Sequence, residues 1–283
     1  MKTQIELLKE LKIPIRGHLG QHLLIDGNIQ KKIVELLDFN QQGNRFVEIG
    51  PGLGALTGHI LERGARLTVV EKDPRLADAL KTIFSEALGQ RQLHVKLADV
   101  LDVDFEELLD QPKQGACQVI SNLPYYITGP ILAKILPLKI FGRAVFMMQQ
   151  EVADRIFAEP GTREYGRLSL LVRFYSEAQH AFDVSPGCFT PPPEVNSSVV
   201  VLKFHNKLKN QDIDEKLLLD LVKAAFSQRR KKLVSSLSQS RFQDIPRDVW
   251  LERFKQTGIS PDVRPEDLGP EDYMALAKAI SRP

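Results

Sequence analysis

Apolar and polar positions follow two alternating periods between residues 45 and 158, and these periods predict alternating strands and helices. Short apolar runs rich in β-branched residues predict strands at Arg45–Ile49, Arg66–Val70, His94–Leu97, Cys117–Ile120 and Ala144–Met148. Helical spacing predicts helices at Ala55–Arg63, Pro74–Leu88, Gly129–Leu136 and Glu151–Ala158. This alternation is typical of an α/β fold, in which helices cover both faces of a parallel sheet.

After about residue 165 the pattern changes. Two further strands are predicted at Leu168–Tyr175 and Val199–Phe204, with the proline-rich stretch Phe189–Pro193 between them. From about residue 207 the sequence is polar with helical spacing, which predicts helices at Ile213–Phe226, Lys231–Leu237 and Tyr273–Ile280. We therefore expect a large domain over residues 1–206 and a small helical domain over residues 207–283.

Composition and charge limit the class of protein only loosely. A chain of 283 residues, 43% of them hydrophobic, is longer than a single core usually requires. The formal net charge is only +2, so any attraction to nucleic acid has to come from local clusters. Cys117 and Cys188 are the two cysteines, too few for a disulfide framework or a cysteine metal site. We expect no metal, and packing roles for both thiols.

From the sequence we expect neither a secretion signal nor a membrane span. Met1–Leu11 carries Glu6, Lys9 and Glu10 among its apolar residues, which interrupts the apolar core that a signal peptide needs. No run approaches the roughly 20 apolar residues of a transmembrane helix. We therefore expect a soluble, cytoplasmic protein without a membrane partner.

A glycine-rich turn follows the first predicted strand. Gly50, Gly52 and Gly54 let the backbone pass close to a ligand, and the helix expected from Ala55 would direct its amide dipole towards that ligand. Glu71, about 20 residues further on, is placed to accept hydrogen bonds from ribose hydroxyls. The turn also matches the loose dinucleotide pattern G-x-G-x-x-A. A nicotinamide cofactor, another nucleoside cofactor and an ordinary turn with solvated carboxylates therefore all remain open.

Polar residues also follow the next predicted strands. Asp99, after the third strand, is well placed to accept a hydrogen bond from an exocyclic amine such as that of a bound adenine. The carboxyl ends of the strands are where open α/β sheets bind their ligands. A cofactor pocket is therefore expected at this edge, although a solvated carboxylate is the alternative for Asp99 alone.

The segment Asn122-Leu123-Pro124-Tyr125 follows the fourth predicted strand and favours methyl transfer to a nucleobase amine. An aromatic amine is a poor nucleophile, because its lone pair is delocalised into the ring. The Asn122 oxygen and the Leu123 carbonyl are each expected to accept one N–H, which favours a pyramidal nitrogen. Pro124 would fix the turn and Tyr125 would stack on the base. A strand-ending turn is the alternative, but the position behind the glycine turn favours catalysis.

These motifs, in this order, resemble those of the small-subunit ribosomal RNA adenine dimethyltransferases, the family of the kasugamycin-sensitivity methylase. That family is similar to the erythromycin-resistance methylases and to a mitochondrial transcription factor. The resemblance extends over almost the whole chain. It is carried by Gly20–Asp26, Val47–Thr57, Val70–Asp73, Asp99-Val100, Asn122–Tyr126, Met148–Val152, Tyr165–Ser169, Phe189–Pro193 and Phe226–Lys231.

The resemblance implies a Rossmann-like methyltransferase domain with an amino-terminal cofactor lid and a small carboxy-terminal helical domain. It implies S-adenosylmethionine as cofactor, and two methyl transfers to N6 of each of two adjacent adenines in the 3′-terminal hairpin loop of small-subunit rRNA. The cofactor-binding residues that it implies are His22, Leu24, Gly50, Glu71, Asp99 and Asn122. This chain departs from many relatives at His22, where they have asparagine, and at Leu19 and Leu23, where they often have phenylalanine.

RNA contacts are expected at local cationic clusters. Arg229, Arg230 and Lys231 belong to a run of four cations, and a looser cationic arm near the amino terminus includes Arg16. Phe189 is expected either at the rim where an extruded adenine enters or in a packed loop. The expected substrate is structured rRNA with unpaired adenines, within a pre-assembled small ribosomal subunit, and the expected protein is a monomer with a role in subunit maturation.

Three alternatives remain at this point. A nicotinamide-dependent dehydrogenase is supported by the glycine turn and Glu71 alone. A non-catalytic RNA-binding or ribosome-assembly factor on the same fold is the second, although the intact Asn122–Tyr125 segment disfavours it. The third is a methylase of large-subunit rRNA, as in the erythromycin-resistance enzymes, because the pocket motifs do not distinguish the two RNAs. The carboxy-terminal domain and Phe189–Pro193 favour the small-subunit branch.

Overall fold

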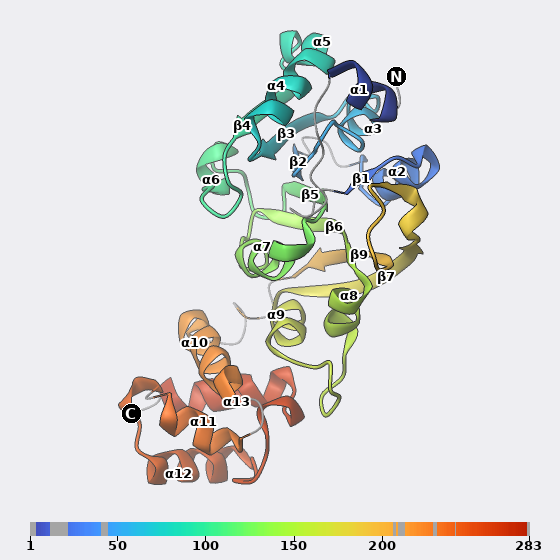
Figure 1. Cartoon of the computed structure of the whole chain (residues 1–283). Coiled ribbons are helices and arrows are strands. Elements are labelled where there is room, and N and C mark those ends of the chain that lie inside the picture. Colours follow the sequence, from blue (N-terminus) through green and yellow to red (C-terminus); the bar gives the residue numbers. More distant parts are fainter. Residues whose placement is uncertain are drawn as a thin grey trace. The chain divides into compact units, whose positions relative to one another are not determined.

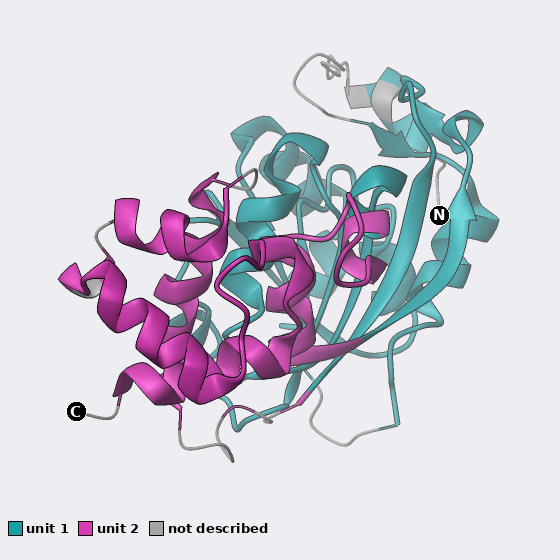
Figure 2. Cartoon of the chain, turned by 90° about the horizontal axis from the view of Figure 1, so that it is seen from below, with its two compact units in different colours: residues 1–153, 178–204 teal, residues 154–177, 205–283 magenta. Residues whose placement is uncertain are grey.

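The computed structural model describes residues 4–11, 22–40, 45–205, 208, 213–228, 231–240 and 242–281. The chain forms two compact units (Figure 2). The first consists of residues 1–153 and 178–204, and the second of residues 154–177 and 205–283. Residues 154–177, expected in the first domain, therefore group with the second unit by their contacts. The functional division into residues 1–206 and 207–283 stays a prediction.

The described part of the first unit is built on a seven-stranded sheet (Figure 1). In spatial order its strands are β4 (Leu93–Leu97), β3 (Arg66–Glu71), β2 (Arg45–Ile49), β5 (Cys117–Asn122), β6 (Phe141–Gln149), β9 (Ser197–Phe204) and β7 (Ser176–Val184). The strands from β4 to β6 are parallel, which confirms the expected α/β arrangement. Strand β9 is antiparallel to β6, so the sheet is mixed rather than fully parallel.

A second, two-stranded sheet joins two distant segments of the first unit. Strand β1 (Leu23–Leu24) pairs antiparallel with β8 (Phe189–Thr190). The Ile25 backbone N–H extends this pairing with a hydrogen bond of 2.8 Å to the Cys188 carbonyl. The segment Leu23–Ile25 is thereby tied to the proline-rich stretch.

The helices that begin in the first unit are interspersed with its strands. They are α1 (Gln4–Leu11), α2 (Gly27–Val34), α3 (Thr57–Leu61), α4 (Pro74–Ile83), α5 (Ser85–Gly89), α6 (Phe105–Leu108), α7 (Thr128–Ile135) and α8 (Gln150–Phe157), with 3₁₀ turns η2 (Tyr125–Ile127) and η3 (Pro186–Cys188). Local sequence explains several of the starts. The Asp26 and Asp73 carboxylates accept hydrogen bonds from the first backbone N–H groups of α2 and α4, and Pro74 occupies the first turn of α4.

Two helix predictions differ from the structure near the glycine turn. The helix expected over Ala55–Arg63 is the shorter α3, because residues 52–56 form turns before it begins. The helix expected over Pro74–Leu88 is divided at Phe84 into α4 and α5. Phe84 packs where the absent side chain of Gly54 leaves room, since a Cβ at Gly54 would lie 2.3 Å from the Phe84 ring.

The second unit is helical. Its helices are α9 (Arg167–Tyr175), α10 (Glu215–Ala225), α11 (Leu233–Gln239), α12 (Arg247–Thr257) and α13 (Pro270–Ser281), with 3₁₀ turns η5 (Phe226–Gln228), η6 (Phe242–Asp244) and η7 (Pro265–Asp267). Trp250, Phe254 and Tyr273 are fully buried at its centre. The Tyr273 hydroxyl donates a 3.0 Å hydrogen bond to the Pro265 carbonyl. This aromatic core gives the unit its own packing centre.

The strand predicted at Leu168–Tyr175 is wrong, because these residues form α9. Four consecutive residues, 169 to 172, are buried, so the segment lacks the polar face that identifies a surface helix. A short apolar run of this kind cannot be assigned to helix or strand from periodicity. The strand is the next segment, β7, at one edge of the sheet, and its polar sequence gave no apolar signal.

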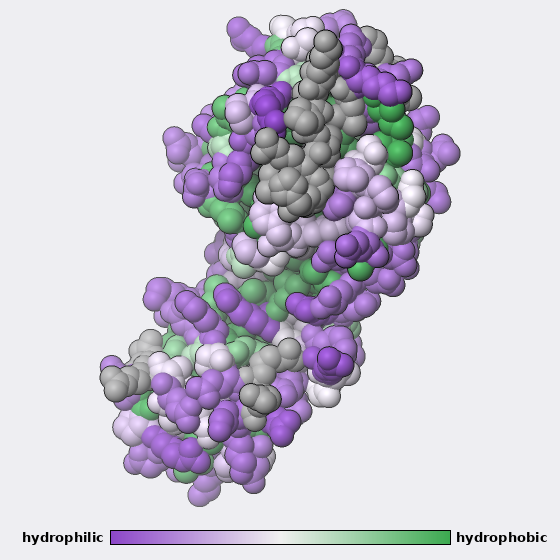
Figure 3. All heavy atoms as spheres, in the orientation of Figure 1, coloured by the Kyte–Doolittle hydropathy of each residue, from purple (hydrophilic) through white to green (hydrophobic). Residues whose placement is uncertain are grey.

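The core of the first unit lies along the central strands. Val47, Val119, Val145 and Val199 are fully buried, one on each of four adjacent strands. Each such side chain contributes about 1.5–3 kcal/mol through burial. Figure 3 shows that the visible surface of each unit is mostly hydrophilic, with smaller hydrophobic areas. Among the described residues, the helices are all too short or too polar to cross a bilayer.

Candidate active site

A cavity of about 890 Å³ opens in the first unit where strands β2, β3, β4 and β5 end. This volume lies in the range of pockets that hold drug-sized ligands and cofactors. Its lining includes the residues predicted to bind cofactor or target base, namely His22, Leu24, Gly50, Glu71, Asp99, Asn122, Leu123, Pro124 and Tyr125. Parallel strands bring these residues together because their carboxyl ends meet at one edge. Their individual roles remain predictions.

The glycines of the turn differ in what they do. Gly50 and Gly52 line the cavity with left-handed φ angles of 62° and 60°. At Gly50 the atom nearest to an added Cβ is Pro124 Cγ, at 3.9 Å, so the backbone is open on the ligand side. Gly54 does not line the cavity, and the space beside it is filled by Phe84. The expectation that all three glycines face a ligand is therefore wrong for Gly54.

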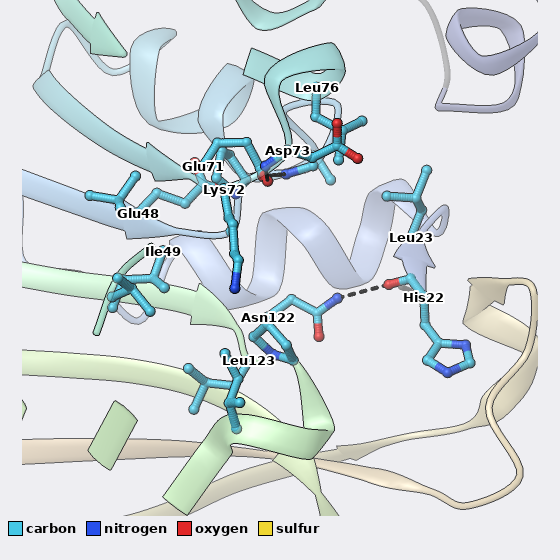
Figure 4. A pocket seen from close by; sticks show the side chains of 18 of the residues that line it. His22, Leu23, Glu48, Ile49, Glu71, Lys72, Asp73, Leu76, Asn122 and Leu123 are labelled. Atoms are coloured by element: carbon cyan, nitrogen blue, oxygen red, sulfur yellow. Dashed lines mark hydrogen bonds between the residues drawn. The ribbon is translucent and has the colours of Figure 1, made fainter. Parts of the chain in front are cut away.

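Glu71 ends β3 and is held by backbone N–H groups. One carboxylate oxygen accepts a hydrogen bond of 2.8 Å from Asp73 N, and the other accepts one of 3.4 Å from Gly52 N. Burial raises the pKa of this carboxyl, and the backbone donors partly oppose that effect. The side chain is fixed between the glycine turn and the start of α4, at the cavity wall (Figure 4).

Glu48 is a second buried acid in the cavity wall, and sequence reasoning did not identify it as a cavity residue. It is 2% exposed, and the Thr57 hydroxyl donates a 2.5 Å hydrogen bond to it. Burial raises its pKa to about 8, so the side chain is mostly protonated at neutral pH. A lone acid in the apolar strand β2, Phe46-Val47-Glu48-Ile49, was the signal that could have found it.

Asp99 follows β4 and forms an ion pair with Lys72, a cavity residue that sequence reasoning also missed. Lys72 Nζ donates to Asp99 Oδ2 over 2.6 Å, and Leu101 N donates to Oδ1 over 3.0 Å. These hydrogen bonds, that from Lys72 first, lower the pKa of Asp99 and keep it an ionised acceptor. Figure 4 shows the side chain of Lys72, the residue directly after β3, extending into the pocket. Its side chain is 69% exposed, so the pair contributes little stability.

Asn122 is the last residue of β5, and its amide has a defined orientation. Its Nδ2 donates a 3.0 Å hydrogen bond to the His22 carbonyl, with the amide oxygen on the opposite side (Figure 4). The preceding residue is anchored by a 2.6 Å hydrogen bond from the Ser121 hydroxyl to the Ile49 carbonyl. The following residue is anchored by Leu123 N, which donates to the Met147 carbonyl over 2.9 Å. A side-chain acceptor is therefore held rigidly at the cavity.

Tyr125 lies in η2 directly after Pro124. Its hydroxyl shares a 2.6 Å hydrogen bond with Ser197 Oγ on β9. Its ring stacks on the His22 ring, with centroids 5.6 Å apart and planes 26° apart. Burial raises the pKa of the phenol, so the ring stays neutral at physiological pH. The Tyr125 ring, which is predicted to stack on the target base, is therefore held both at its hydroxyl and at its face.

Of the residues predicted to contact RNA, the structure describes Phe189 and Lys231, and neither lines this cavity. Phe189, the first residue of β8, is 3% exposed and packs in the hydrophobic core, so it does not form an open rim. The packed-loop interpretation fits this burial. Lys231 is exposed in the second unit. Arg16, Arg229 and Arg230 lie outside the described residues, as does Leu19.

Comparison with known proteins assigns the chain to a family. The family model described as ribosomal RNA adenine dimethylase matches residues 14–282. A ribosomal RNA small subunit methyltransferase A from Halothermothrix orenii is 37% identical over 97% of this chain and 91% of that protein. The chain belongs to the ribosomal RNA adenine dimethylase family. A protein of the same name from Chlamydia trachomatis is 35% identical, over 97% of each chain.

Solved structures agree with this family at the level of the fold. A dimethyladenosine transferase from Plasmodium falciparum has a TM-score of 0.73 and 23% identity, and covers 90% of this chain and 96% of its own. The 23S rRNA methyltransferase ErmE has a TM-score of 0.61 and 22% identity, over 92% of this chain and 100% of its own. The Rossmann-like methyltransferase fold is confirmed, and the dimethylase family removes the dehydrogenase interpretation.

Proposed function

We propose that this dimethylase transfers methyl groups from S-adenosylmethionine to N6 of two adjacent adenines in the 3′-terminal hairpin loop of small-subunit rRNA. The observation that carries the proposal is the fixed amide of Asn122 in one cavity with Glu71 and Asp99. The carboxylates suit a nucleoside cofactor, and the amide suits an amine substrate.

The residues present fit S-adenosylmethionine. The Glu71 carboxylate would accept from the ribose hydroxyls, and Asp99 from the adenine amine, since both are acceptors at the cavity wall. Gly50 offers open backbone for the methionine portion, and His22 and Leu24, which also line the cavity, would form the cofactor entrance. Bound there, the cofactor supplies an electrophilic methyl group on its sulfonium.

The chain's own residues would position the nucleophile. The Asn122 oxygen and the Leu123 carbonyl would accept the two N–H bonds of the target amine, which localises the lone pair on nitrogen. The Tyr125 ring would stack on the base, and Pro124 maintains the turn between them. No strong base is required, because the product proton can leave to water.

We infer which ribosomal RNA is the substrate from the names of the relatives. Proteins 35–37% identical to this chain are named small subunit methyltransferases, whereas the large-subunit enzyme ErmE is 22% identical. We propose that the substrate is a pre-assembled small subunit, and that the protein binds it through Arg16, Arg229, Arg230 and Lys231. We also propose that the protein is a monomer and that it acts in the cytoplasm, where such subunits form. A role in small-subunit maturation belongs to the same proposal.

The experiment is methyl transfer from radiolabelled S-adenosylmethionine to purified ribosomal subunits from cells that lack this protein. The proposal predicts N6,N6-dimethyladenosine in small-subunit rRNA, at two neighbouring positions near the 3′ end. Naked small-subunit rRNA and large subunits serve as parallel substrates. Label in large-subunit rRNA would favour the erythromycin-resistance-like specificity, and RNA binding without label would favour a non-catalytic assembly factor.

A further inference from the structure

His22 makes three contacts with groups on the base side of the active site. Its carbonyl accepts from Asn122 Nδ2, its ring nitrogen Nδ1 bonds to the Pro191 carbonyl, and its ring stacks on Tyr125. We infer that His22 is a positioning residue for the nucleobase, and that it holds Asn122 and Tyr125 in the arrangement that receives the target adenine. This inference rests on the proposed function.

The hydrogen bond between Asn122 and the His22 carbonyl determines which end of the Asn122 amide is available to a substrate. The His22 carbonyl is only an acceptor, so the amide nitrogen has to face it across the 3.0 Å bond. A flipped amide would place two acceptors against each other and lose the hydrogen bond. The orientation that leaves the Asn122 oxygen available to an amine is therefore selected by the position of the His22 backbone.

The second contact fixes the position of His22 itself. The Pro191 carbonyl accepts the 2.8 Å hydrogen bond, so Nδ1 of the imidazole carries the proton. His22 directly precedes β1, and Pro191 directly follows β8, the strand that pairs with it. The hydrogen bond from the His22 ring adds a further link between the two segments of this short sheet. It stabilises the backbone at His22, whose carbonyl orients Asn122.

The third contact limits the motion of Tyr125. The Ser197 hydroxyl bonds to one end of this side chain, and the His22 ring covers part of its aromatic surface. A ring held at its hydroxyl and at its face loses little further freedom when a base stacks on it. Such preorganisation lowers the cost of binding the extruded adenine and of aligning its amine.

Three substitutions separate these effects. His22→Ala removes the ring but keeps the backbone carbonyl, His22→Asn keeps an N–H donor near Nδ1, and His22→Phe keeps an aromatic ring without the donor. The control is His94→Ala, an exposed histidine on β4 that does not line the cavity. Calorimetry gives the cofactor Kd, and steady-state transfer to small subunits at saturating cofactor gives kcat and the KM for RNA.

The inference predicts that His22→Ala lowers kcat at least about tenfold, because a displaced amide and ring misalign the amine. The cofactor Kd should change by a smaller factor than kcat, since Gly50, Glu71 and Asp99 still line the cofactor pocket. His22→Asn or His22→Phe should restore part of the lost kcat, and His94→Ala should match the wild type. As a second measurement, 2-aminopurine at the target position should be quenched less by His22→Ala than by the wild type.

A weaker cofactor affinity with unchanged kcat and quenching would overturn the inference and leave His22 as a cofactor contact only. Unchanged values of all three quantities would overturn it as well. If His22→Ala does not fold, the same comparison between the wild type, His22→Asn and His22→Phe decides. Failure of the proposed function would look different, because the wild type itself would then transfer no methyl group to small-subunit rRNA.

Discussion

Replacing Glu48 by glutamine tests whether a buried acid in the cofactor cavity titrates near neutral pH. The Glu48 side chain is 2% exposed, and burial raises its pKa from 4.5 to about 8. The nearby charge of Glu71 acts in the same direction. Glutamine keeps the shape and an acceptor for the Thr57 hydroxyl, so the substitution removes the titration with little change in packing.

The direction in which stability changes with pH follows from proton linkage. A carboxyl whose pKa is higher in the folded protein binds its proton more tightly there, so stability falls as pH rises from about 4.5 to about 8. At about 1.36 kcal/mol per pKa unit, the full loss is on the order of 5 kcal/mol. Somewhat more than half of this loss falls between pH 6 and pH 9, because most of the titration of the folded protein lies in that range. The glutamine variant lacks this loss, so its stability relative to the wild type should increase with pH.

The assay is urea unfolding at pH 6 and at pH 9, followed by circular dichroism. Tryptophan fluorescence is unsuitable, because Trp250 lies in the second unit. The advantage of Glu48→Gln over the wild type should grow with pH, by on the order of 3 kcal/mol between the two pH values. Glu194→Gln, at an exposed glutamate, is the matched control and should show no such growth. An equal difference at both pH values would refute the shifted pKa.

Three further predictions concern the cofactor, the RNA and the glycine turn. Glu71→Ala should weaken cofactor binding about 10- to 100-fold in calorimetry, because it removes a charged acceptor, and an unchanged Kd would exclude the ribose contact. Replacing both Arg229 and Arg230 by alanine should weaken RNA binding and reduce its salt slope by about two, whereas an unaltered slope would place the RNA surface elsewhere. Gly54→Ala should lower the free energy of unfolding by about 2–4 kcal/mol in urea melts, because its φ is 82° and its Cβ would collide with Phe84. Intact stability would contradict that packing role.

The convergence of the site residues was predictable from the sequence. Gly50, Glu71, Asp99 and Asn122 each follow a predicted strand, and parallel strands end at the same edge of a sheet. The strand and helix alternation that gives this geometry has a strong periodic signal. The cavity could therefore be located from the pattern alone, before any distance was known.

Other features depend on contacts between distant segments, which a local pattern does not contain. The Lys72–Asp99 ion pair joins the ends of β3 and β4. The hydrogen bond from Asn122 to the His22 carbonyl joins the end of β5 to the start of β1. The raised pKa of Glu48 results mainly from the burial of this side chain within strand β2. The helix over Arg167–Tyr175 was mistaken for a strand because its burial in the second unit removed the polar face that distinguishes a helix.

The central claim is that the fixed Asn122 amide places a target adenine against the methyl donor. The most direct measurement is single-turnover methyl transfer to small subunits by the wild type and by Asn122→Ala, with the cofactor Kd and the RNA affinity measured on the same preparations. The account predicts a transfer rate at least about 100-fold lower for the variant, a loss of about 2.7 kcal/mol of transition-state stabilisation. RNA affinity should stay close to the wild-type value, and cofactor binding should be retained. A transfer rate within about threefold of the wild type, at saturating cofactor and RNA, would contradict it.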